Sequence, residues 1–254
     1  MNALLLFLCL ILPLQAQELN LRAPNQSFDF IDQKNGVGNS CGPASILNAF
    51  GSGSKEWQIP FKKIPATSDR TRISSVIRSW GQVPSNTLPG RKRWEIKGGS
   101  NFVDLTVMAN EMRKLHWKLP KLKSELFFAT PGPKSEISLN QAHKRLQKSL
   151  KKGFPPLLSI RRFVLRKGQW QSVHGHFVVL TAMPDKLTRG TRTFPIEFVD
   201  PIGAKTYRAE ITASDRNNTL PSLILSCPSN VIGKSQVKSG EQHALGLTGA
   251  IGSW

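Results

Sequence analysis

Cys41 is the residue of this chain best suited to act as a nucleophile. Residues 44–50 are mostly apolar and compatible with a helix, Pro43 suits its first turn, and Gly51 suits its end. A thiol at the start of such a helix lies near unpaired N–H groups and the positive end of the helix dipole, which favour the thiolate that nucleophilic attack requires. The alternatives are a buried, inert cysteine or one half of a disulfide.

His176 and Asp200 have the residue types of a general base and of the carboxylate that orients it. His176 directly precedes the apolar run 177–180, and Asp200 ends the run 196–199 just before a turn that begins with Pro201. If these runs pair as antiparallel strands, the start of the first lies beside the end of the second, and the two side chains become neighbours. Taken singly, His176 could be a core histidine and Asp200 a turn residue. The joint order of cysteine, histidine and aspartate favours a catalytic triad.

A helix and two strands must position these residues. The apolar pattern of the chain changes from that of helices to that of strands after residue 152. The remaining helices are expected at 68–80, 101–116 and 138–152, the last starting with a capping box at Ser138 and Gln141, and strands at 155–160, 175–183, 193–199, 205–210 and 223–227. Helices followed by strands favour an α+β domain with an antiparallel sheet.

The segments between these elements carry less pattern. Residues 28–31 are typical of a short strand, whereas 57–65 and 84–99 are typical of loops, the second exposed and basic. His143 lies among the polar residues of its helix, so we expect it to be solvated.

The N-terminal residues have the pattern of an export signal. Residues 1–16 are a short apolar block that ends in Ala16, as in a secretory signal peptide. The block is shorter than the roughly 20 residues that span a bilayer, and no later stretch is long and apolar enough. We therefore expect a loose lead-in at 17–27, one domain over 28–254, and a secreted or periplasmic protein without a transmembrane segment in its mature chain.

The charge of the chain is strongly positive. It has 35 Lys and Arg against 16 Asp and Glu, a formal net charge of +19, which attracts polyanions. An anionic cell-envelope polymer or an acidic protein is therefore a possible partner. Specific nucleic-acid binding is not expected, because no helix-turn-helix, zinc-finger or RNA-recognition pattern accompanies the charge.

The cysteines leave one structural alternative. After removal of residues 1–16, only Cys41 and Cys227 remain, too few for a disulfide framework. A single Cys41–Cys227 bridge would be possible in an oxidising compartment, and it would abolish the nucleophile.

The order of four motifs resembles the papain-like cysteine peptidases of the bacteriocin-processing (double-glycine leader) type and their free-standing secreted relatives. The motifs are Gln33 with 41–45, then 153–158, 175–180 and 199–203, and the resemblance covers residues 28–207. It implies a papain-like fold, with a helical half that carries the nucleophile and an antiparallel sheet half that carries base and orienter. It also implies that Cys41 is the nucleophile, His176 the general base and acid, and Asp200 the residue that fixes the imidazole. His174 lies on the same face of an ideal strand, but His176 matches the family pattern.

The resemblance further implies that Gln33 helps to stabilise the oxyanion together with the backbone N–H of Cys41. Gln33 stands farther from the cysteine than is usual in the family, and Asn35 and Asn39 are the possible substitutes. The predicted function is that of a thiol-dependent hydrolase, a cysteine peptidase cleaving peptide or isopeptide bonds in a peptide or protein substrate, without cofactor or metal. The alternative is a non-catalytic exported binding protein that uses the same scaffold and its basic surface to hold an anionic polymer.

Overall fold

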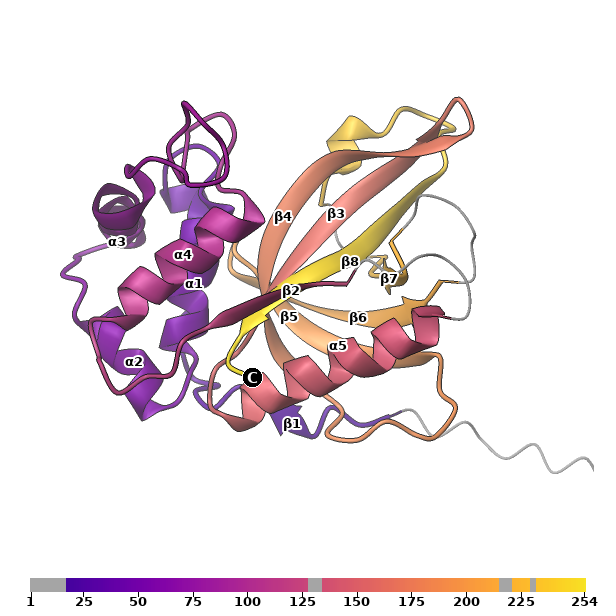
Figure 1. Cartoon of the computed structure of the whole chain (residues 1–254), viewed down its shortest axis with the longest axis horizontal. Coiled ribbons are helices and arrows are strands. Elements are labelled where there is room, and N and C mark those ends of the chain that lie inside the picture. The colour runs from indigo at the N-terminus through magenta and orange to yellow at the C-terminus, as the bar shows by residue number, and fades with distance from the viewer. Residues whose placement is uncertain (1–16, 128–133, 215–220, 229–231) are drawn as a thin grey trace, which may run out of the picture.

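The computed structural model describes residues 17–127, 134–214, 221–228 and 232–254. The expected signal peptide, residues 1–16, lies outside the described residues. Within the described ranges the chain forms a group of helices beside an antiparallel sheet, as Figure 1 shows. The α+β class expected from the sequence is confirmed.

The first half of the chain is mainly helical. Its helices are α1 (Cys41–Gly51), α2 (Lys55–Lys62), α3 (Asp69–Val76) and α4 (Phe102–Arg113), with a short 3₁₀ turn η1 (Gln33–Asn35) before α1 and a π-helical turn η2 (Ile77–Gly81) after α3. Ser68 and Thr71 form a capping box at the start of α3, and the Asn101 side chain accepts the Asp104 N–H at the start of α4. Helices α3 with η2 and α4 thus match the predicted helices closely.

The second half contains most of the sheet. The strands are β1 (Leu21–Arg22), β2 (Lys123–Leu126), β3 (Leu157–Arg166), β4 (Gln169–Met183), β5 (Thr193–Asp200), β6 (Lys205–Ala213), β7 (Leu223–Ser226) and β8 (His243–Gly252). They pair in the order β4-β3-β8-β7-β6-β5, and β5 pairs again with β4, so that these six strands close into a ring. Closure removes the free edges from all six strands.

Two hydrophobic clusters hold the fold together. One cluster lies between the ring of strands and helix α5 (Lys134–Lys151). Helix α5 contributes to it Leu139, Ala142, Leu146 and Leu150. The other joins α1 and α4 to β4 through residues such as Leu47, Leu105 and Val179, and Cys41 packs against it. The nucleophile candidate therefore lies where the helices meet the sheet.

Two of the predicted local structures in the first half are wrong. Residues 55–62 form α2 instead of a loop, because Trp57 is buried and packs against Phe50 and Phe154, which stabilises a helix despite an internal proline. Residues 28–31 form no strand. The backbone N–H and C=O of Ile31 bond instead to the Asn48 side chain, at 2.7 and 3.1 Å.

Helix α5 also differs from its prediction. It begins at Lys134, four residues before the predicted capping box, so Ser138 lies inside the helix. His143 on this helix is buried, not solvated. Its Nε2 lies 2.9 Å from the Pro184 carbonyl oxygen, and its ring packs edge-on against Phe194. Burial lowers the pKa of His143, which favours a neutral side chain.

Candidate active site

Cys41 is the first residue of α1, as the sequence predicts, and its side chain is partly exposed. Every other residue of α1 is buried, so the helix is a fixed support. The Ser45 hydroxyl donates to the Phe177 carbonyl oxygen at 2.9 Å, which ties this helix to β4 directly beside His176. A cysteine on the helix and a histidine on the strand are thereby held in register.

His176 and Asp200 form a buried pair. His176 Nε2 lies 2.7 Å from Asp200 Oδ1, and the two residues are only 3% and 2% exposed. Strands β4 and β5 are antiparallel, with Val179 opposite Val199, which is the arrangement that brings the start of one strand to the end of the other. Asp200 Oδ1 also accepts the Ile202 N–H at 2.8 Å, so the carboxylate is fixed by its own turn.

The Cys41 and His176 side chains lie close enough that each shifts the pKa of the other. Because Nε2 of the ring faces Asp200, Nδ1 is the nitrogen left for the sulfur. The three side chains therefore form a continuous series from thiol to imidazole to carboxylate. This is the geometry in which an imidazole can take a proton from a thiol while a carboxylate holds its orientation.

The electrostatics favour an ion pair between Cys41 and His176. Burial by itself raises the pKa of the thiol, but the hydrogen bond and charge of His176 outweigh it, so that the pKa of Cys41 lies below its ordinary value. Backbone N–H groups of Phe177 and Gly42 also donate to the sulfur. For His176, burial by itself lowers the pKa. The interactions with Asp200 and Cys41 outweigh burial and raise the pKa of His176 to about 10. The two shifts act in the same sense, because each favours the charged form of its group, a thiolate beside an imidazolium.

His174 has a different environment from His176. It is half-buried and stacks on the His176 ring, with centroids 6.3 Å apart, and it sits opposite Arg162 in the β3–β4 pair. Burial, followed by the charges of His176 and Arg162, lowers the pKa of His174. His174 is thus a half-buried neighbour of the His176–Asp200 pair, and its lowered pKa favours the neutral form.

Gln33 lies in η1, which is attached to the turn that follows Asp200. The Gln33 N–H donates to the Pro201 carbonyl oxygen at 2.8 Å, while its side-chain Oε1 is buried and has no hydrogen-bond partner among the described residues. The two substitutes are already engaged. The Asn35 amide donates to Asp69, and the Asn39 amide donates to the Ile96 and Lys97 carbonyl oxygens. Of the three amides, that of Gln33 is the one left uncommitted.

Asp32 is a positioning residue that the sequence reasoning missed. Its Oδ1 accepts the N–H groups of Gly203, at 2.8 Å, and of Lys34, at 2.9 Å. It thereby joins η1 to the β5–β6 turn. Its place at the N-cap of a short turn was the available clue, because an aspartate there accepts local N–H groups. The long-range bond to Gly203 had no counterpart in the sequence.

The basic segment 84–99 is held by bridges and by a buried tryptophan. It contains two isolated bridges, Pro84 with Lys92 and Glu95 with Gly99, and Trp94 is buried. The Trp94 indole N–H donates to the Asn39 carbonyl oxygen at 2.9 Å, and the Asn39 N–H donates to Ile96. The segment is therefore packed against the residues that lead into Cys41.

Cys41 and Cys227 are not joined by a disulfide in this structure. Cys227 is buried in the cluster beneath α5, whereas Cys41 packs against the cluster of the helical half. The Cys227 thiol donates to the Arg208 carbonyl oxygen at 3.4 Å. The two sulfurs thus belong to separate parts of the molecule.

The described ranges contain neither a cluster of metal-binding side chains nor a helix that could span a membrane. No group of three or more His, Cys, Asp or Glu residues there could hold a metal ion. Likewise, none of the helices in those ranges combines the length and the apolar character that crossing a membrane requires.

Comparison with known proteins identifies no relative. The chain matches no protein-family model, and a search of curated proteins returns no significant match.

Proposed function

We propose that this protein is a thiol-dependent hydrolase, a secreted cysteine peptidase with a papain-like fold that cleaves peptide or isopeptide bonds. The observation that carries the proposal is the buried hydrogen bond between His176 and Asp200 beside Cys41, where helix α1 meets the sheet and where Cys41 and His176 shift each other's pKa. The order of the motifs in the sequence supports it independently, through their resemblance to bacteriocin-processing peptidases.

In the proposed reaction the Cys41 thiolate attacks the carbonyl carbon of the scissile amide. His176, protonated at Nδ1 in the ion pair, gives its proton to the departing amine, and the acyl group remains on the sulfur. His176 then accepts a proton from water, the resulting hydroxide attacks the thioester, and the acid product leaves as the Cys41 sulfur regains its thiolate and the imidazole keeps the proton. Asp200 keeps the ring oriented throughout.

The negative charge that develops on the carbonyl oxygen requires donors. The backbone N–H of Cys41 has no acceptor among the described residues, as expected for the first residue of a helix. We assign it and the Gln33 side-chain amide to this role. The Gln33 side-chain amide makes no hydrogen bond to another described residue, which supports the assignment, because the Asn39 amide donates two hydrogen bonds and the Asn35 amide donates one.

The decisive experiment is covalent labelling of the mature chain with an epoxide inhibitor of cysteine peptidases, followed by mass spectrometry to locate the modified residue. We expect modification at Cys41 and loss of hydrolysis of a fluorogenic peptide mixture. Cys227→Ala is the matched control and should label as the wild type does. Modification at Cys227 alone would contradict the proposal.

The net charge of +19 favours one other candidate, an exported protein that binds an anionic polymer without catalysis. Thiol titration of the mature native protein separates the two. A reactive Cys41 thiol supports the hydrolase. A protein that has no titratable thiol, yet binds a polyanion in a salt-dependent way, would be the binding protein.

A further inference from the structure

A cavity of about 610 Å³ is lined by residues of strands β3, β6, β7 and β8 and of the turn that carries Lys234. Its thirteen lining residues include none of Cys41, His176 and Asp200. The volume lies within the range of sites that bind small molecules. The cavity is therefore large enough for a ligand of its own.

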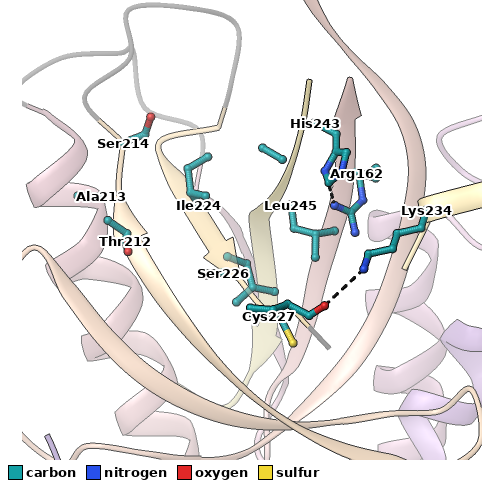
Figure 2. A pocket seen from close by; sticks show the side chains of 13 residues that line it. Arg162, Thr212, Ala213, Ser214, Ile224, Ser226, Cys227, Lys234, His243 and Leu245 are labelled. Atoms are coloured by element: carbon teal, nitrogen blue, oxygen red, sulfur yellow. Dashed lines mark hydrogen bonds between the residues drawn. The ribbon is translucent and has the colours of Figure 1, made fainter. Parts of the chain in front are cut away.

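The lining of this cavity has an asymmetric chemistry. Three basic side chains, Arg162, Lys234 and His243, border it, whereas none of the described residues that line it is Asp or Glu. Ile224, Leu225 and Leu245 supply apolar walls. Figure 2 shows Arg162 and His243 together on one side, with Ile224 opposite.

Arg162 is a buried cation that has no acidic partner among the described residues. It is 3% exposed, and its Nε donates to the Ile232 carbonyl oxygen at 2.9 Å while Nη1 lies 3.0 Å from His243 Nδ1. Neither partner is an anion, and within the described ranges no carboxylate pairs with Arg162. Burying an uncompensated charge is costly.

The other nitrogen of the guanidinium, Nη2, has no hydrogen bond in the described part of the chain. The turn that carries Lys234 is pressed closely onto Arg162, since a Cβ at Gly233 would come within 2.9 Å of the Arg162 Cβ. Lys234 itself is exposed at the rim of the cavity. Arg162 thus keeps one donor, Nη2, for a ligand, and Lys234 supplies a second positive charge at the same cavity.

We propose that this cavity binds an organic carboxylate with an apolar body, its carboxylate on Arg162 and its apolar part against Ile224, Leu225 and Leu245. A planar carboxylate can accept two parallel hydrogen bonds from the guanidinium. A compact inorganic anion has no apolar part that could contact the apolar walls. Burial lowers the pKa of Arg162, which agrees with a cation whose charge is not yet balanced.

The test uses octanoate as the probe, titrated calorimetrically into the mature chain at about 0.15 M salt, where unspecific attraction to a basic surface is reduced. Octanol has the same chain without the charge, and inorganic phosphate has charge without the chain. We expect octanoate to bind at one site and at least about tenfold more tightly than either. Equal binding of octanol or of phosphate would overturn the proposal.

Arg162→Gln should weaken octanoate binding at least about tenfold. The matched control is Arg161→Gln, which removes the same charge from the next residue of β3, on its exposed side. If both variants lose affinity equally, the site is not the one described.

Two further variants keep the test decisive if Arg162→Gln does not fold. Ile224→Trp fills the cavity from a partly exposed position and should abolish binding, and Lys234→Ala changes an exposed rim residue and should weaken it several-fold. Unchanged binding in both would refute the proposal. Cys41→Ala should bind octanoate as the wild type does, so this result is independent of the proposed hydrolase activity.

Discussion

The alkylation rate of Cys41 should be almost independent of pH between pH 6 and pH 8. His176 lowers the pKa of Cys41 and has its own pKa raised to about 10, and we therefore expect thiolate and imidazolium to coexist throughout this range. Raising the pH from 6 to 8 should therefore change neither group. The thiolate carries no proton, and His176 loses its proton only as the pH approaches 10.

The magnitude follows from the fraction of thiolate. An ordinary thiol with a pKa of about 8.5 is about 0.3% ionised at pH 6 and about 24% at pH 8, so its alkylation rate rises about 80-fold. For Cys41 we expect a ratio below about 3. The ratio is more informative than the rate itself, because a thiolate of low pKa is also intrinsically less nucleophilic.

His176→Ala should convert the flat profile into a steep one. Without the imidazolium, burial is the strongest remaining influence, and it raises the pKa of Cys41. The variant should therefore show a rate ratio of at least about 80 between pH 8 and pH 6. His174→Ala is the matched control, since it removes the stacked neighbour and leaves the His176–Asp200 pair in place.

The assay is timed iodoacetamide labelling, with the modified cysteines separated and quantified by mass spectrometry. Two results would refute the reasoning. One is a ratio near 80 for Cys41 in the wild type, and the other is faster modification of Cys227 than of Cys41 at pH 6.

Three further predictions concern the triad and its support. His176→Ala should lower turnover at least about a thousandfold while His174→Ala keeps most of it, measured with a fluorogenic peptide; the reverse result would reassign the base. Asp200→Asn should keep partial turnover because its amide oxygen can still accept the ring N–H, Asp200→Ala should lose at least about tenfold more, and EDTA should affect neither; equal losses in two folded variants would argue against an orienting role. Asn48→Ala should lower the free energy of unfolding by about 2–4 kcal/mol in urea titration, because both backbone groups of Ile31 lose their buried partner; a loss below about 1 kcal/mol would show that water replaces the amide.

Local sequence patterns predicted the parts of the site that depend on element ends. Pro43 and the apolar residues after it mark the start of α1, and Asp200 with Pro201 marks the end of β5, because turn residues and caps act within a few residues of themselves. The pairing of antiparallel strands β4 and β5 then followed from the order of apolar runs, and with it the proximity of His176 to Asp200. Each of these predictions depends only on residues close together in the chain, or on two strands that follow one another.

The elements that the sequence did not reveal are those whose stability comes from distant partners. Strand β8 contains three glycines, which weaken any strand pattern, yet it pairs with β3 along most of its length. At Gly246 a Cβ would come within 2.1 Å of Pro221, and at Gly249 within 2.7 Å of the Glu125 carbonyl oxygen. The glycines are there because neighbouring chain passes close by, which no local pattern records.

The same distinction applies to the polar residues around the triad. The sequence by itself determined which residue types stand at the ends of a helix and two strands, since propensities and turn chemistry are local. Only the tertiary structure decided that Asp32 bonds to Gly203, that the Asn35 and Asn39 amides donate to other residues, and that Arg162 is buried with no acidic partner in the described part of the chain. A side chain acquires its hydrogen-bond partners, its burial and its pKa from residues far away in the chain, so these properties exist only once the fold has formed.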